Sequence, residues 1–190
     1  MYLFTNMKKL FVNIMAALKC AFLILFDRSE AEIGAVLQKE NKKIATAESC
    51  TGGLLSSFLT DISGSSEYIK ANFVTYANEA KEQYLEVSNE ILHEYGAVSP
   101  QTARAMVEGL LEHTDADYAA ATTGIAGPTG GTEEKPVGLV YIGVGNRERI
   151  VVKKYNVHPL TYRRFAKIQF AKEALKIMKE FLRENEKCTD

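Results

Sequence analysis

Cysteine and histidine are scarce in this sequence, and neither forms a clustered pattern. The three cysteines (Cys20, Cys50 and Cys188) are an odd number and have no C-x-x-C spacing. They predict a reducing compartment and no structural zinc site. The three histidines are equally scattered. A metal-dependent mechanism is therefore disfavoured, and only metal sites built from carboxylates stay open.

The sequence also lacks a clustered basic footprint. Its formal net charge is −1, and no basic run is longer than two residues. Nucleic-acid binding requires clustered positive charge to neutralise phosphates, so nucleic acid is not expected as a partner. At 190 residues, the chain is long enough to form one domain with a full core and no disulfides.

Residues 1–28 form an apolar extension ahead of the domain predicted for residues 29–190. Lys8-Lys9 and the apolar stretch after them resemble a secretory signal, but no small-residue cleavage site follows. Lys19 divides the apolar stretch, and neither part reaches the roughly 18–20 residues that span a bilayer. We therefore expect no stable membrane insertion. The extension is a helix packed on the body or a partner, a weak membrane-surface anchor, or a segment upstream of the true start; the first and third are favoured.

Apolar periodicity alternates between the helical and the extended pattern along the rest of the chain. Capping signals mark four helix starts: Ser29 with Glu32, Asn78, Ser88, and Ser99 with Pro100. Helices are expected at 29–40, 54–62, 78–85, 88–95, from 99 onward, and at 161–184. Strands are expected at 43–46, 68–76, 117–123, 137–145 and 149–157. The alternation predicts an α/β fold with a mixed sheet.

The segment Thr46–Gly53 stands where the first of these strands gives way to a helix. It places two hydroxyls and a thiol, from Ser49, Cys50 and Thr51, ahead of two glycines. The first N–H groups of a helix have no internal partner and carry the positive end of its dipole. The segment is therefore either an ordinary helix cap or a site that stabilises an anion or an oxyanion.

A second unusual segment follows the strand at 117–123. The loop Gly124–Thr132 holds four glycines and one proline in nine residues, more than a connecting turn requires. Glycine-rich loops commonly bind phosphate or another anion through backbone N–H groups. We expect an anion or a nucleotide phosphate at this loop.

Three segments together resemble one known family. They are Thr46–Gly53, then Tyr76-Ala77-Asn78-Glu79-Ala80-Lys81 with Gly96–Ser99, then Thr123–Pro128 with Gly130–Thr132 and Lys135–Gly138. In order and spacing they resemble the CinA C-terminal domain, also called the PncC-type nicotinamide-nucleotide amidohydrolase, over about residues 30–184. The resemblance implies a single-domain, three-layer α/β/α sandwich, often a homo-oligomer. It also implies hydrolysis of nicotinamide mononucleotide to nicotinate mononucleotide and ammonia, in the stand-alone form of the family.

An amide is a poor electrophile, so a metal-free, cofactor-free hydrolase needs an activated nucleophile, an oxyanion site and a proton donor. The resemblance implies a Ser-Tyr-Lys grouping here. Ser49 is the predicted nucleophile and Lys81 its base, because a lysine amine in a dry pocket loses pKa. Tyr76 is expected to relay the proton or to orient Ser49. Cys50 is the chemical rival of Ser49, since a thiolate at a helix N-terminus is activated.

The substrate, a small pyridine nucleotide, is expected to meet residues of the same segments and the start of the C-terminal helix. The predicted substrate-binding residues are Glu48, Cys50, Thr51, Gly52, Gly53, Thr123, Gly124, Gly127, Arg163 and Arg164. A protein of this kind is expected in the cytoplasm. Two alternatives stay open: a nucleotide-binding, competence-associated module without turnover, and an amidase for a different small amide.

Overall fold

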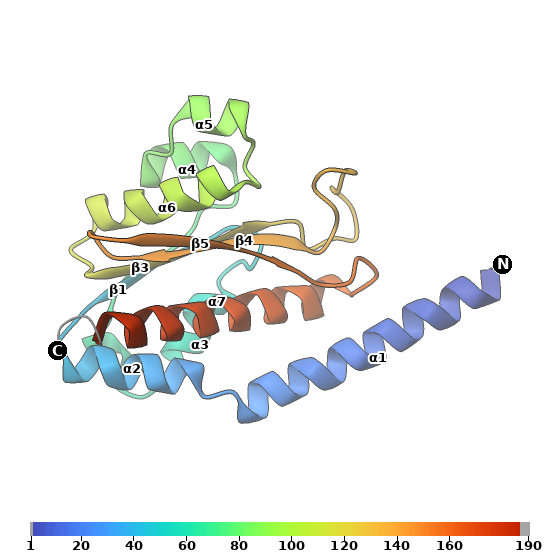
Figure 1. Ribbon diagram of the computed structural model, residues 1–190, viewed down its shortest axis with the longest axis horizontal. Coiled ribbons are helices and arrows are strands. Elements are labelled where there is room, and N and C mark those ends of the chain that lie inside the picture. Colours follow the sequence, from blue (N-terminus) through green and yellow to red (C-terminus); the bar gives the residue numbers. More distant parts are fainter. Residues whose placement is uncertain (1, 187–190) are drawn as a thin grey trace.

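The computed structural model describes residues 2–186 and contains five strands and seven α-helices in that range (Figure 1). The strands are β1 (Ile44–Glu48), β2 (Ile69–Val74), β3 (Tyr118–Gly124), β4 (Leu139–Gly145) and β5 (Ile150–Asn156). The helices are α1 (Tyr2–Phe26), α2 (Ser29–Lys39), α3 (Leu54–Thr60), α4 (Asn78–Leu85), α5 (Asn89–Glu94), α6 (Pro100–His113) and α7 (Arg163–Glu186), with a short 3-10 helix at Ser65–Glu67. Cys188 lies outside the described residues.

The five strands form one mixed sheet in the order β2-β1-β3-β4-β5. The strand β1 pairs in parallel with both β2 and β3, whereas β3, β4 and β5 pair antiparallel. The small side chains of β3 suit this position, because both of its faces are covered and its residues are buried up to Thr123. The predicted α/β class and mixed sheet are confirmed.

Helices cover both faces of the sheet, which makes the predicted three-layer sandwich (Figure 1). One face carries α4, α5 and α6, and its core holds Leu85, Leu92 and Met106 against alanines of β1 and β3. The other face carries α2, α3 and α7, with Leu37, Leu59 and Phe170 in its core. The apolar faces that the helical periodicity predicts are therefore buried in two separate cores.

The N-terminal extension is one continuous helix, α1, that lies below the α2–α3–α7 layer in Figure 1. Lys19 divides the apolar stretch of the sequence but does not interrupt the helix. The Lys19 amine instead reaches the Tyr155 hydroxyl at 3.0 Å on the body of the domain. By length and composition, the described stretch Asn6–Lys39 contains one helix that is long and apolar enough to cross a membrane.

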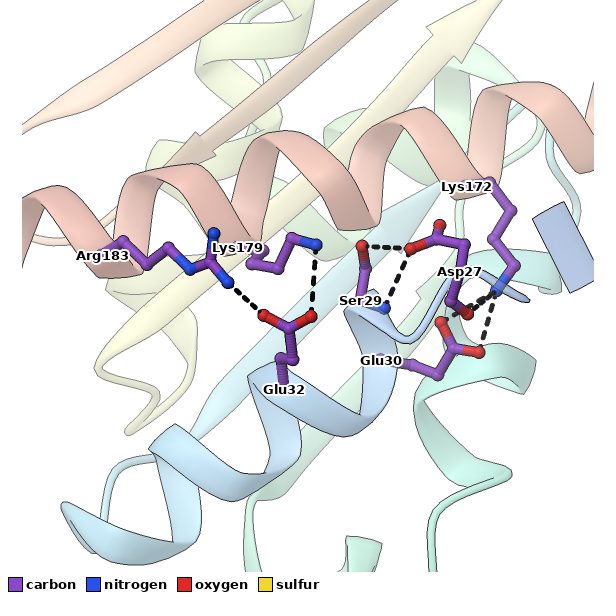
Figure 2. A network of polar contacts seen from close by, with 7 residues as sticks. All are labelled: Asp27, Ser29, Glu30, Glu32, Lys172, Lys179 and Arg183. Atoms are coloured by element: carbon purple, nitrogen blue, oxygen red, sulfur yellow. Dashed lines mark hydrogen bonds and ion pairs between the residues drawn. The ribbon is translucent and has the colours of Figure 1, made fainter. Parts of the chain in front are cut away.

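Ionic contacts hold α2 against α7 (Figure 2). Lys172, only 1% exposed, reaches both carboxylate oxygens of Glu30 at 2.8 Å. Glu32 pairs with Lys179 and Arg183. The capping box predicted for Ser29 and Glu32 is therefore wrong. Glu32 is drawn to the basic side chains of α7, and the Ser29 hydroxyl donates to the Asp27 carboxylate at 2.6 Å.

The other capping signals have mixed outcomes. The Ser88 and Ser99 hydroxyls accept backbone N–H groups of α5 and α6, as predicted, and Pro100 opens α6. Asn78 is instead the first residue of α4, and its preceding residue Ala77 caps without a side-chain hydrogen bond. The first strand also runs to Glu48, two residues beyond the prediction, because it has a parallel partner on each side up to that point.

Candidate active site

The carboxyl ends of the three parallel strands lie side by side. The pairing aligns Glu48 of β1 with Val74 of β2 and with Thr122 of β3. The residues that come next form a row across the sheet: Thr75, Ser49 and Thr123. Ligands of open α/β sheets bind at this edge, beyond the carboxyl ends of the strands.

The row faces the α4–α5–α6 layer. Ala47, Phe73 and Ala121 lie two residues before the row in their strands, and all three pack in that core. Side chains alternate between faces along a strand, so the side chains of the row point to the same side. Ser49 is also held to β3, since its N–H donates to the Thr122 carbonyl at 3.0 Å. Its side chain is partly exposed.

Lys81, from α4, meets Ser49 on this side of the sheet. Its Nζ lies 3.3 Å from the Ser49 Oγ, 2.8 Å from the Thr75 carbonyl oxygen and 3.5 Å from the Tyr76 carbonyl oxygen. The side chain is fully buried. Because burial disfavours the ammonium form, the pKa of the Lys81 amine is lowered. The structure therefore brings the predicted nucleophile and base into contact, across 32 residues of sequence.

Cys50 lies on the other side of the sheet. It is 4% exposed and packs in the core that α7 covers. Burial raises the pKa of its thiol to about 12, so the thiol is protonated at neutral pH and is a poor nucleophile. The position and pKa of Cys50 both favour Ser49 as the nucleophile. The neighbouring Thr51 is buried too, with its hydroxyl 2.7 Å from the Thr122 hydroxyl. Neither side chain is placed to contact a substrate, contrary to the expectation.

Glu48 caps α3 instead of contacting a substrate. One of its carboxylate oxygens accepts the N–H groups of Gly53 and Leu55, at 3.0 and 3.1 Å. The other accepts the N–H and the hydroxyl of Ser56, at 2.8 and 2.6 Å. A carboxylate has about four acceptor sites, and all four are in use. The positive end of the α3 dipole is therefore occupied by an internal anion, and the Gly53 N–H is not available to an oxyanion.

The backbone N–H groups between Ser49 and Gly53 are the remaining candidate donors to an oxyanion. Among residues 2–186, the N–H groups of Thr51 and Gly52 have no hydrogen-bond acceptor. Gly52 is exposed and has a φ of +62°, a conformation that favours glycine. A Cβ built on Gly52 would lie 3.1 Å from the Lys167 amine of α7. A basic side chain therefore stands beside the turn that follows Ser49.

The glycines of the loop after β3 have a packing role. A Cβ on Gly124 would lie 2.5 Å from the Leu139 carbonyl oxygen, and one on Gly127 would lie 2.4 Å from a methyl group of Val137. Gly124, the last residue of β3, is thus required for close packing against β4. Gly127, with a φ of +77°, is required for the loop to close against Val137, whether or not the loop binds an anion. The Thr123 hydroxyl is buried and donates to the Ala97 carbonyl at 2.6 Å, which leaves it an acceptor only.

Tyr76 and Arg163 form a bridge beside the site. The Arg163 guanidinium donates to the Tyr76 hydroxyl at 2.7 Å and to the Gly127 carbonyl at 2.9 Å. The Tyr76 side chain is 61% exposed, and its contact with Lys81 is made by its carbonyl oxygen. The Tyr76 hydroxyl thus bonds to Arg163, and within residues 2–186 it makes no hydrogen bond to Ser49 or Lys81. Arg163 and Arg164 also line a groove of about 610 Å³ between α1, α3 and α7.

Thr75 is a candidate that the sequence analysis missed. It is 1% exposed, and its hydroxyl has no hydrogen-bond partner among the described residues. A buried hydroxyl without a partner is costly, and a catalytic role or a bound ligand is one explanation for such a group. Strand pairing puts Thr75 beside Ser49, and this pairing cannot be seen in the sequence. The only available signal was the position of Thr75 next to Tyr76. Among the same residues, no group of three or more His, Cys, Asp or Glu side chains is arranged to hold a metal ion.

Comparison with known proteins matches most of the chain to one family. Residues 27–182 match the family described as CinA C-terminal domain. A CinA-like protein of Syntrophomonas wolfei is 48% identical over 151 residues, which are 80% of this chain and 36% of that protein. A CinA-like protein of Chloroherpeton thalassium is 47% identical over 155 residues, 80% of this chain and 37% of that protein. The chain thus spans about a third of the length of the curated relatives it matches.

Solved structures of similar length share the fold. The competence/damage inducible protein CihA from Agrobacterium tumefaciens has a TM-score of 0.74 and 38% identity, over 81% of this chain and 96% of that chain. The competence damage-inducible protein A (ComA) from Klebsiella pneumoniae has a TM-score of 0.76 and 30% identity, over 80% of this chain and 94% of that chain. The matched family region begins at residue 27, so α1 lies outside it.

Proposed function

The chain belongs to the CinA C-terminal domain family, and from this membership and its Ser49–Lys81 contact we propose that it is a metal-independent amidohydrolase. Its substrate is nicotinamide mononucleotide, and its products are nicotinate mononucleotide and ammonia. The names of its relatives give only the family and competence or damage induction. The proposed reaction is therefore argued from the residues of the site. We also propose that it works as a homo-oligomer in the cytoplasm, as the family resemblance implies.

The observation that carries the proposal is the surroundings of the Lys81 amine. A neutral amine has two N–H donors and one lone pair. Two backbone carbonyls, of Thr75 and Tyr76, lie within reach of the two donors. The lone pair is then left for the Ser49 hydroxyl proton, across the 3.3 Å contact. Burial lowers the pKa of Lys81, which favours the neutral amine that a general base requires.

The chemistry runs through an acyl-enzyme. The Ser49 Oγ attacks the amide carbon while Lys81 takes the hydroxyl proton. Lys81 then gives this proton to the amide nitrogen, the C–N bond breaks, and ammonia leaves. Water attacks the resulting ester with Lys81 again as the base, and Lys81 returns the proton to the Ser49 Oγ as the acid departs. Atoms and protons balance with water as the only co-reactant.

The oxyanion of each tetrahedral intermediate is assigned to the N–H groups of Thr51 and Gly52. They lie two and three residues after Ser49, and they remain after Glu48 has taken the donors at the start of α3. Backbone donors fixed in a turn need no reorganisation during the reaction, which makes them effective stabilisers of developing charge. The unpartnered Thr75 hydroxyl is assigned to the amide group of the substrate, beside Ser49.

The phosphate of the nucleotide is assigned to the basic side chains at the start of α7. Arg163 is held in place by the Tyr76 hydroxyl and the Gly127 carbonyl, and its guanidinium offers a planar donor fork suited to phosphate. In this proposal Tyr76 positions Arg163, and its part in proton transfer stays a prediction.

The test is an incubation of the purified protein with nicotinamide mononucleotide in the presence of EDTA. Ammonia and nicotinate mononucleotide are expected in equal amounts, and reaction in ¹⁸O-water should place the label in the product carboxylate. Saturable binding of the nucleotide without ammonia would instead support a binding module. Turnover of another small amide, but not of this one, would keep the mechanism and change the substrate.

A further inference from the structure

One face of α1 is apolar and uncovered over its described length. Large apolar side chains that are 50–67% exposed recur along it: Met7, Leu10, Phe11, Ile14, Met15, Leu18, Phe22, Leu25 and Phe26. At 1.5 Å per residue this face, from Met7 to Phe26, is about 29 Å long. Exposed side chains of this size are normally scattered singly, whereas a contiguous apolar patch marks an interaction surface. We call this set the α1 outer face.

The opposite face of α1 is docked on the domain. Asn13 is 5% exposed, and its amide donates to the Leu160 carbonyl at 3.0 Å while its oxygen accepts the Tyr162 N–H. Ala16 and Cys20, one and two turns further on, are buried as well. This stripe of residues, spaced by three or four, fixes the rotation of α1. The outer face therefore points away from the body because of specific contacts.

The surroundings of the outer face are basic. The described part of α1 contains Lys8, Lys9 and Lys19 and no acidic residue. The groove beside it, lined by Ile24, adds the basic side chains of Arg163, Arg164 and Lys167. The nearest acidic side chains of α2 are already neutralised by α7, as Figure 2 shows for Glu30 and Glu32. The Asp27 carboxylate, just after α1, accepts hydrogen bonds from Ser29. The face thus combines a long apolar stripe with positive charge that exceeds this one nearby carboxylate.

We propose that the α1 outer face is a docking surface for an anionic lipid bilayer, in which α1 lies in the interface plane and the domain takes the place of the usual polar helix face. Apolar area and attraction to anionic headgroups are the two terms that drive such binding. A second copy of the chain is a less suitable partner for this face. A two-fold contact would bring together two copies of α1, which carries lysines and no acidic residue in its described part.

A surface position agrees with the contacts better than a spanning one. Insertion across the bilayer would pull Asn13 from its two backbone partners and place Lys19 within the hydrocarbon, away from the Tyr155 hydroxyl. An interfacial helix keeps both contacts, since only its outer face enters the lipid. The inference concerns a segment outside the matched family region and does not depend on the amidohydrolase activity.

The experiment is flotation of the full-length protein with vesicles of phosphatidylcholine alone and of mixed phosphatidylcholine and phosphatidylglycerol. The wild type is expected to float with the mixed vesicles and only weakly with the neutral ones. The double variant Phe11→Gln/Phe22→Gln removes two aromatic rings that are more than 60% exposed, and should bind about a hundredfold more weakly. The matched control Tyr84→Gln removes an exposed ring from α4, on the opposite layer (Figure 1), and should bind like the wild type.

Charge is tested separately with Lys8→Gln, which should weaken binding to the mixed vesicles about fivefold and leave binding to neutral vesicles unchanged. Circular dichroism checks that each variant is folded, and sedimentation velocity without lipid gives its oligomeric state. The proposal is overturned if the wild type does not bind mixed vesicles, or if the double variant binds them equally well. It is also overturned if the double variant, and not the control, changes the oligomeric state, since a second copy would then cover the face.

Discussion

Replacement of Lys81 by methionine separates the catalytic role of this side chain from its structural one. Methionine has a similar volume and length but no amine. It leaves the Thr75 and Tyr76 carbonyls without their donor, at about 1 kcal/mol each. It also removes the cost of burying an amine. The two effects oppose one another, so the free energy of unfolding should change by no more than about 2 kcal/mol.

The effect on activity should be far larger. A positioned general base contributes about 10² to 10⁴ in rate, and Lys81 is assigned both the removal of the Ser49 proton and its delivery to the leaving nitrogen. We expect kcat/KM for nicotinamide mononucleotide to fall about 10³-fold or more, which is about 4 kcal/mol of transition-state stabilisation. The assay is initial rates of ammonia release, with urea unfolding of the same preparations to confirm that they are equally folded.

The pH dependence gives a second readout of the same substitution. The pKa of Lys81 is lowered in the folded protein from its ordinary 10.5, and the reaction needs the neutral amine. Wild-type kcat/KM should therefore rise with pH through the folded-state pKa. Between that pKa and 10.5 the unfolded chain binds more protons, so wild-type stability should also rise with pH over this window. Both slopes should be absent in Lys81→Met. A variant that keeps more than about a tenth of wild-type activity would refute the assignment of Lys81 as the base.

Three further substitutions test other parts of the site. Glu48→Gln keeps the shape of the α3 cap, but its amide N–H₂ group would face N–H and hydroxyl donors that need an acceptor. The free energy of unfolding in urea should fall by about 2–4 kcal/mol, and an unchanged value would refute the cap. Thr75→Val removes the unpartnered hydroxyl, and should raise stability by about 1 kcal/mol while lowering kcat/KM about tenfold; unchanged kcat/KM would exclude a substrate contact. Arg163→Gln should raise the KM for nicotinamide mononucleotide about tenfold but not that for nicotinamide riboside, which lacks the phosphate; an equal rise for both would remove Arg163 from the phosphate site.

The elements of this fold could largely be predicted from sequence because their signals are local. Periodicity marks α6 and α7, and the small side chains of β3 indicate a strand buried on both faces. Ser88 and Ser99 act as caps because each needs only an N–H group three residues ahead. Ser29 and Glu32 do not form a capping box because each has another partner. The Ser29 hydroxyl donates to Asp27, and Glu32 pairs with basic side chains of α7. This competition for partners is a tertiary effect.

The site was predicted in its chemistry but not in its geometry. Ser49 and Lys81 could be named from motifs, but their contact follows from the pairing of β2 with β1. Glu48 was predicted to contact the substrate, whereas the chain turns back so that N–H groups at the start of α3 saturate its carboxylate. Gly124 and Gly127 looked like a phosphate loop, although close packing against β4 already requires them. Lys19 divides an apolar stretch of the sequence, but its contact with Tyr155, 136 residues away, could not be predicted from that stretch.

The central claim is that Ser49, and not the neighbouring thiol, is the nucleophile of a metal-independent amidohydrolase. The most direct test measures ammonia release from nicotinamide mononucleotide, with EDTA present, by the wild type, Ser49→Ala and Cys50→Ala. Activity in the wild type and in Cys50→Ala, with none above background in Ser49→Ala, is the predicted result. Retained activity in Ser49→Ala, or activity lost in a folded Cys50→Ala protein, would contradict it.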